Sequence, residues 1–146
     1  MTARKTSIFL PETANGRTRE LIVEVLEARA DPARCVEYFH DDAVFYVLGR
    51  ICDYPASGAF RGREQILNHF RRIDSEVECS ERKILNLVVE GDKVGVRRSV
   101  VVRHHGTAAV SKLIFADFVT FRDSKIVEVY EYADTAWLKR LSGDED

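Results

Sequence analysis

Three segments in the second half of the chain alternate between apolar and other side chains, and each apolar set contains a single charge. The sets are Val94, Val96, Arg98, Val100, Val102; Leu113, Phe115, Asp117, Val119, Phe121; and Val127, Val129, Glu131, Ala133. Because successive side chains of a strand point to opposite faces, each set shares one face of a β-strand. A buried charge is costly unless it is paired or put to use. The pattern therefore predicts a polar cluster inside a mostly apolar cavity.

The remaining periodicities predict helices in the first half of the chain and a long antiparallel meander in the second. Predicted helices span residues 18–29, with Thr18 as N-cap, then 32–39 after the Asp31-Pro32 pair, and 63–73. Predicted strands span 43–48, 59–60, 81–90, 93–104, 108–122 and 125–133, with turns at 40–42, 91–92, 105–106 and 123–124, and a final short helix carries Trp137. This order predicts an α+β domain in which a strongly curved, mixed or antiparallel sheet holds the helices on its concave face.

Length and composition limit the class of protein. The 146 residues suit one domain, which we place at 17–142 between a lead-in at 1–16 and an acidic tail at 143–146. A net charge of −2 does not indicate a surface that binds nucleic acid. The three cysteines form no C-x-x-C pair, and no apolar run reaches transmembrane length. These observations predict a cytoplasmic protein with free thiols and no membrane or nucleic-acid partner.

Three stretches resemble the SnoaL-like (polyketide-cyclase-like) branch of the nuclear-transport-factor-2-like superfamily. They are residues 38–44 (YFHDDAV), 60–66 (FRGREQI) and 115–134, which begins FADFVTFRD. The resemblance implies a cone-shaped fold with a pocket for a small hydrophobic molecule between the sheet and the helices. It also implies a homodimer through the convex sheet face, where Ile114, Ala116, Phe118, Tyr130 and Tyr132 would lie. Function does not follow from this fold, because the superfamily includes isomerases, cyclases, epoxide hydrolases, dehydratases and binding proteins.

Epoxide-hydrolase members resemble this chain at Arg98 and Glu131, where they carry an arginine and an aspartate. Their central aspartate, two residues after the arginine, corresponds to Val100 here. The departure argues against epoxide hydrolysis by that scheme and leaves an Arg98–Glu131 pair. This pair is either part of an active site or a buried ion pair that fills the cavity floor.

Asp117 is the third charged candidate. Among Leu113, Phe115 and Phe121 its pKa would be raised by desolvation unless a cation such as Arg98 stabilises the ionised form. A raised pKa suits a general acid or base near neutral pH, as in the ketosteroid-isomerase members of the superfamily. The alternative is a carboxylate that only braces a loop by hydrogen bonds. A β-bulge would shift the face assignment.

The candidates for lining the pocket are Tyr46, Tyr54, His69, Val100 and Phe115. Tyr46 competes with its neighbour Phe45 for the pocket face, Tyr54 lies on a loop at 49–62 that resembles a lid, and His69 flanks the helix at 63–73. No spaced set of ligands predicts a metal, and no glycine-rich fingerprint predicts a nucleotide cofactor.

Two functions remain. The first is cofactor-free acid–base chemistry of the isomerase or cyclase type on a small carbonyl or polyketide-like compound, with Glu131 or Asp117 carrying the proton and Arg98 stabilising the anion. The second is a binding or dimeric interaction protein without turnover, in which the same residues orient a ligand or brace the sheet.

Overall fold

The computed structural model of the chain describes residues 10–48 and 58–133. In chain order the elements are α1 (Leu10–Ala28), α2 (Pro32–Cys35), a 3₁₀ turn η2 (Val36–Tyr38), β1 (Phe39–Leu48), β2 (Gly58–Arg61), α3 (Gly62–Glu76), β3 (Val77–Glu90), β4 (Lys93–His104), β5 (Val110–Arg122) and β6 (Lys125–Tyr132). The six strands form one sheet in the order β2-β1-β6-β5-β4-β3. β1 and β6 are parallel, and every other neighbouring pair is antiparallel.

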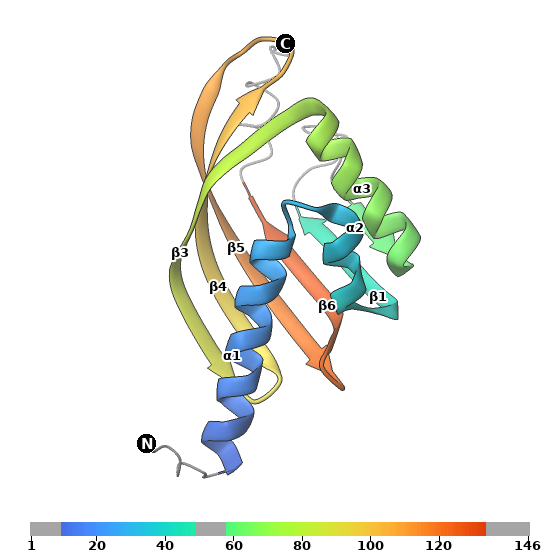
Figure 1. The fold of residues 1–146 in the computed structure, drawn as a ribbon, viewed down its shortest axis with the longest axis vertical. Coiled ribbons are helices and arrows are strands. Elements are labelled where there is room, and N and C mark those ends of the chain that lie inside the picture. The colour runs from blue at the N-terminus through green and yellow to red at the C-terminus, as the bar shows by residue number, and fades with distance from the viewer. Residues whose placement is uncertain (1–9, 49–57, 134–146) are drawn as a thin grey trace.

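The helices lie on one face of this sheet, and β3, β4 and β5 bend around them (Figure 1). The α+β class and the cone-like arrangement predicted from the sequence are confirmed. β4 has the predicted bounds, and the Asp123-Ser124 turn between β5 and β6 has positive φ at both residues, +52° and +65°. Such a turn matches the right-handed twist of the strands that it joins.

Helix α1 begins at Leu10, so the prediction that Thr18 caps its N-terminus is wrong. Thr18 lies inside the helix, is buried, and donates a hydrogen bond from Oγ1 to the carbonyl of Gly91 at 2.7 Å. The amide of Gly91 in turn donates to Asn15 Oδ1 at 2.7 Å. The helix therefore runs through Asn15 and Gly16 because its side chains hold the β3–β4 turn, which local propensity does not reveal.

Two strands also begin earlier than predicted. β1 starts at Phe39, so the predicted turn at His40–Asp42 is an irregularity within a strand, where the pairing moves from Phe39↔Ile126 to Val44↔Glu128. β3 starts at Val77 and contains two register shifts. Asp31 occupies the predicted N-cap position before Pro32, although its side chain makes no capping hydrogen bond. The predicted helix after Asp134 lies outside the described residues.

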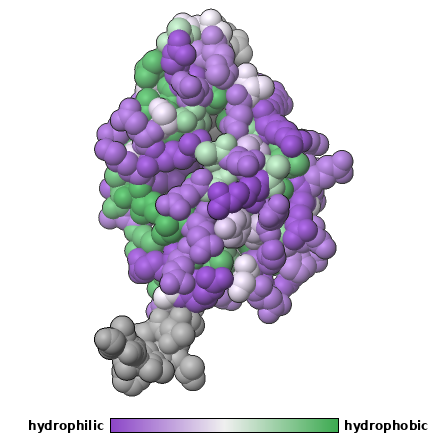
Figure 2. Space-filling model, in the orientation of Figure 1, coloured by the Kyte–Doolittle hydropathy of each residue, from purple (hydrophilic) through white to green (hydrophobic). Residues whose placement is uncertain are grey.

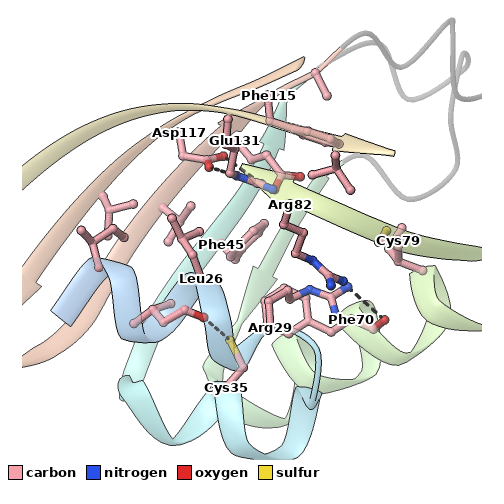
Figure 3. A pocket seen from close by; sticks show the side chains of 18 of the residues that line it. Leu26, Arg29, Cys35, Phe45, Phe70, Cys79, Arg82, Phe115, Asp117 and Glu131 are labelled. Atoms are coloured by element: carbon pink, nitrogen blue, oxygen red, sulfur yellow. Dashed lines mark hydrogen bonds and ion pairs between the residues drawn. The ribbon is translucent and has the colours of Figure 1, made fainter. Parts of the chain in front are cut away.

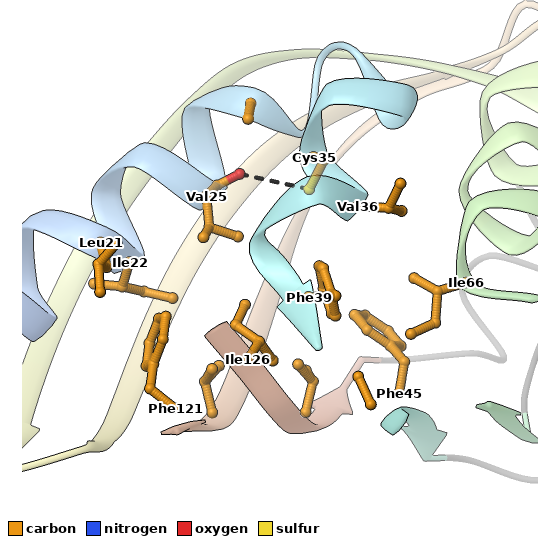
Figure 4. Close-up of a cluster of buried hydrophobic side chains, with 14 of the residues drawn as sticks. Leu21, Ile22, Val25, Cys35, Val36, Phe39, Phe45, Ile66, Phe121 and Ile126 are labelled. Atoms are coloured by element: carbon orange, nitrogen blue, oxygen red, sulfur yellow. Dashed lines mark hydrogen bonds between the residues drawn. The ribbon is translucent and has the colours of Figure 1, made fainter. Parts of the chain in front are cut away.

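The main core lies between the helices and the centre of the sheet. Figure 4 shows Ile22 and Val25 of α1, Phe39 and Phe45 of β1, and Ile126 of β6 converging there. A second cluster, Val77, Val100, Val102 and Leu113, occupies the end of the sheet that β3 shares with β4 and β5. The two clusters bracket the cavity described below.

The surface on the helix side is mostly hydrophilic (Figure 2). Apolar exceptions on the edge strand β3 are Ile84, Leu85 and Val88, which are 39 to 67% exposed. Among the described residues, no helix is both long and apolar enough to cross a membrane.

Candidate functional site

The three predicted charges meet on the concave face of the sheet. Arg98 of β4 donates from Nε to Asp117 Oδ2 of β5 at 2.5 Å and from Nη2 to Glu131 Oε2 of β6 at 2.8 Å. Asp117 and Glu131 are directly opposed in the β5–β6 ladder, and Arg98 pairs with Phe115, two residues from Asp117. The guanidinium group also covers the Phe115 ring, 4.5 Å from its centroid. The sequence thus identified all three side chains, and the structure joins them into one cluster.

The β5–β6 ladder contains the irregularity that strand periodicity does not predict. Its pairing moves from Thr120↔Glu128 to Phe121↔Ile126, so one extra residue lies in β6. Ile126 and Val129 therefore both face inward, and the prediction that Val127 lies on the pocket face is wrong. Glu131 keeps its predicted face because the irregularity precedes Val129.

The charges of the cluster are shielded from water. The side chains of Arg98, Asp117 and Glu131 are 17, 5 and 15% exposed. Burial and the neighbouring Asp117 raise the pKa of Glu131 to about 7, although Arg98 opposes the shift. Burial works against the charge of Arg98, but Asp117 and Glu131 outweigh it and raise the pKa of the guanidinium. The cluster therefore holds a permanent cation beside a carboxyl group that exchanges its proton near neutral pH.

The cluster lies at the floor of a cavity of about 360 Å³ between the sheet and the helices (Figure 3). The walls are mainly apolar and come from α1, α3 and the concave sheet face; they include Leu26, Phe45, Phe70, Val100, Phe115 and Val119. Such a volume suits a small organic ligand, and a mostly apolar wall with a few polar groups is typical of ligand pockets.

The aromatic candidates are divided between the two faces of the sheet. Phe45 lines the cavity, whereas Tyr46 stacks on Tyr130 with ring centroids 4.7 Å apart and does not line it. Tyr46 is therefore not a pocket residue, contrary to the prediction. Val100 and Phe115 do line the pocket as predicted, and Tyr54 lies outside the described residues.

His69 of α3 also lines the cavity, and it is only 5% exposed. Its ring stacks on Phe60 at a centroid distance of 4.0 Å, and its Nδ1 atom is buried without a hydrogen-bond partner in the described structure. Burial, with the positive charges of Arg29 and Arg72, lowers the pKa of His69 to about 4. The ring is thus neutral at physiological pH and holds an unused polar atom inside an apolar wall.

Replacing His69 with phenylalanine is expected to reduce acid sensitivity. The folded-state pKa lies below the usual value of 6.5, so the neutral ring contributes stability that is present above pH 6.5 and lost as the pH falls toward 4. His69→Phe should remove a loss on the order of 3 kcal/mol over that window. Urea unfolding at pH 7 and pH 4.5 measures the effect, with the exposed His105→Gln as control. Equal pH dependence in the native protein and His69→Phe would contradict the buried neutral ring.

Three cationic pocket residues, Arg29, Arg82 and Lys83, were not predicted from the sequence. Arg29 at the end of α1 follows Val25 and Leu26 at helical spacing, so its position on the inner face could have been inferred. It binds Asp74 through two hydrogen bonds of 3.0 and 3.1 Å and lies 4.3 Å from the Phe70 ring centroid. Arg82 and Lys83 of β3 also line the pocket, but no periodicity marks them.

The position to which the resemblance assigns a central carboxylate is occupied by Val100. Val100 is 3% exposed and belongs to the apolar wall. Asp117 reaches Arg98 from the neighbouring strand instead, so the cluster still contains two acids and one arginine. Within residues 10–48 and 58–133, no three His, Cys, Asp or Glu side chains are grouped so as to hold a metal ion.

Comparison with solved structures supports the fold. A nuclear-transport-factor-2-like protein from Burkholderia xenovorans matches with a TM-score of 0.76 at 21% identity, covering 88% of this chain and 97% of the other. TerC co-crystallised with polyporic acid matches at 0.72 and 18%, covering 87 and 98%. An epoxide hydrolase from M. tuberculosis, described as LEH-like, matches at 0.66 and 18%, covering 82 and 84%.

A comparison with curated protein sequences finds no match. The family model for the SnoaL-like domain matches residues 20–129, which is most of the chain and contains Arg98 and Asp117. The match also includes α3 and most of the residues that line the cavity, and Glu131 lies just beyond its end. The fold is that of nuclear-transport-factor-2-like proteins, and the chain belongs to the SnoaL-like domain family.

Proposed function

We propose that this protein binds a small hydrophobic carbonyl compound in its pocket and moves a proton on it without a cofactor. The observation that carries the proposal is Glu131, a carboxyl group whose pKa is raised to about 7 beside Arg98 at the floor of an apolar cavity. A general acid or base works best when its pKa lies near the operating pH.

In this reaction Glu131 takes a proton from the carbon next to the carbonyl and returns it to another atom of the same molecule. The intermediate is an enolate, whose negative charge needs a fixed donor. Arg98 uses Nε and Nη2 for the two acids, and none of the described residues accepts a hydrogen bond from its Nη1. We assign Nη1 to the enolate oxygen, and His69 Nδ1 to a second polar group of the ligand.

Asp117 holds the arginine in this scheme. It is the more deeply buried of the two acids, and it accepts the closest hydrogen bond that Arg98 donates. Epoxide hydrolysis is not favoured, because Val100 replaces the carboxylate that the corresponding scheme uses to activate water.

The second candidate is a binding protein without turnover. It is favoured by the mutual pairing of Arg98, Asp117 and Glu131, since buried ionic networks also occur in purely structural roles. We also propose that the chain forms a homodimer through the convex sheet face, where Ile114, Phe118 and Tyr132 are 45 to 58% exposed.

The deciding experiment separates binding from chemistry. Cyclic ketones, lactones and steroid-like ketones are screened by thermal shift on the native protein, on Glu131→Gln, and on Glu128→Gln as a control from the same strand. A ligand at about 100 times its Kd should stabilise the native protein by about 2.7 kcal/mol.

Hits are then incubated in D₂O, and deuterium uptake next to the carbonyl is followed by NMR. The proposal expects uptake with the native protein and Glu128→Gln but none above background with Glu131→Gln. Binding to all three proteins without deuterium uptake would establish the binding protein instead.

A further inference from the structure

A β-bulge in the edge strand β3 determines which charge faces the pocket mouth. Ser80 pairs with Val101 and Lys83 pairs with Ser99, so Glu81 and Arg82 together oppose Val100. Glu81 has φ of +47°, a left-handed conformation that is uncommon for a residue with a side chain. Bulges often redirect a side chain next to a functional site.

The bulge places the basic side chain of Arg82 on the pocket face in place of the acidic side chain of Glu81. Cys79 lines the pocket, so uninterrupted alternation would place Glu81 on the pocket face and Arg82 on the outer face. With the extra residue, Arg82 lines the pocket and Glu81 does not. The strained backbone at Glu81 therefore places the guanidinium group of Arg82 at the mouth of an apolar cavity.

This guanidinium is unpaired in the part of the chain that the structure describes, where Arg82 makes no hydrogen bond or ion pair. Figure 3 shows its side chain extending from the sheet layer toward Arg29 on the helix layer. Both charges act on the thiol of Cys79, whose pKa is raised by burial and lowered by Arg82 and Arg29. Arg29 is already neutralised by Asp74, which leaves one free guanidinium fork.

We propose that the mouth binds the carboxylate of an apolar organic acid, with Arg82 as the principal ligand and Lys83 beside it. The inference rests on the proposed pocket function and adds the class of ligand. One guanidinium group binds one carboxylate through two parallel hydrogen bonds. Because the mouth also contains the acid Glu27, the charge of the mouth suits a monoanion better than a phosphate dianion. The apolar body of the ligand then extends between Phe70 and Leu26 toward the floor.

The test uses two probes of nearly the same size and shape, the anion 1-naphthaleneacetate and the neutral 1-naphthaleneacetamide. Their dissociation constants are measured by calorimetry at pH 7.5 for the native protein, for Arg82→Ala, and for Arg103→Ala, an exposed arginine of β4 that does not line the pocket. The native protein and Arg103→Ala should bind the acid about 10-fold more tightly than the amide. Arg82→Ala should bind both probes with Kd values within about twofold of each other, and its amide affinity should equal that of the native protein.

The possible failures are distinguishable. Equal binding of acid and amide to the native protein overturns the carboxylate subsite but leaves the pocket function intact. A preference for the acid that survives in Arg82→Ala places the anion elsewhere and also overturns the inference. If neither probe binds, the inference is overturned, and if the ketone screen is also empty, the pocket function fails together with it. Because Arg82 is exposed, Arg82→Ala should fold normally, and Arg82→Lys should retain part of the preference.

Discussion

Replacing Arg98 with methionine is expected to destabilise the protein by about 3 to 5 kcal/mol at pH 7.5, the usual cost of breaking a buried ion pair from one side. The substitution leaves Asp117 and Glu131 directly opposed on neighbouring strands, with their side chains only 5 and 15% exposed and no cation between them. Methionine fills much of the volume of the arginine stem, so most of the loss comes from charge rather than from a cavity. Urea unfolding of the native protein and Arg98→Met measures it.

The loss should be smaller in mild acid. Arg98 opposes the upward shift of the pKa of Glu131, so its removal raises that pKa further above about 7. A group whose folded-state pKa exceeds the unfolded value stabilises the fold at low pH, and this contribution disappears as the pH rises through the folded-state pKa. Arg98→Met should therefore approach the native stability near pH 5 and fall behind it toward pH 8.

The neighbouring Arg97→Ala provides a matched control. Arg97 is exposed, lies on the opposite face of β4, and hydrogen bonds to Asn86 at 2.7 Å. Its removal should cost less than about 1 kcal/mol at either pH. Addition of Asp117→Asn and Glu131→Gln to Arg98→Met should recover most of the lost stability. A pH-independent loss in Arg98→Met would show that packing, and not charge, explains the effect.

Replacing Glu131 with glutamine is expected to stabilise the protein at alkaline pH. The pKa of Glu131 rises from 4.5 to about 7 on folding, so the native protein gains a contribution that is fully present below pH 4.5 and lost as the pH rises through 7. Integrated over that window the loss is on the order of 3 kcal/mol. Glutamine is neutral throughout and can still accept the hydrogen bond from Arg98.

Unfolding free energies at pH 5, 7 and 8.5 should therefore be similar for the native protein and Glu131→Gln at pH 5 and should diverge in favour of the variant at pH 8.5. Glu128→Gln, from the same strand but outside the cluster, is the control at all three values. If Glu131→Gln is the less stable protein at pH 8.5, the carboxylate is better solvated than its burial indicates. If Glu131→Gln gains stability and loses proton transfer, it shows the exchange of activity for stability that is expected at a functional site.

The position of the charged cluster could be predicted because β4 and β5 alternate without interruption on the segments that carry it. Arg98 and Asp117 share their faces with valine, leucine and phenylalanine, and the structure buries these faces as the pattern indicates. Glu131 was placed correctly although Val127 was not, because the bulge in β6 shifts only the residues before it.

Other features could not be read from periodicity. Phe45 and Tyr46 belong to two interleaved sets in β1, and both sets are apolar enough to face a core, so the pattern does not choose between them. The inward position of Arg82 depends on a bulge with a glutamate, which no sequence rule marks. The start of α1 depends on contacts of Asn15 and Thr18 with Gly91, far away in the chain.

The parallel pairing of β1 with β6 has a consequence for synthesis on the ribosome. Phe45 of β1 pairs with Val129 of β6, so the two partners are separated by roughly eighty residues, and closing such a contact is slow compared with forming local helices and hairpins. While the chain emerges, β1 has only the short β2 beside it and exposes one edge to other nascent chains. The strand that protects this edge is also the strand that delivers Glu131. Completion of the sheet and assembly of the cluster of Arg98, Asp117 and Glu131 are therefore one event, and this event comes late in synthesis of the chain.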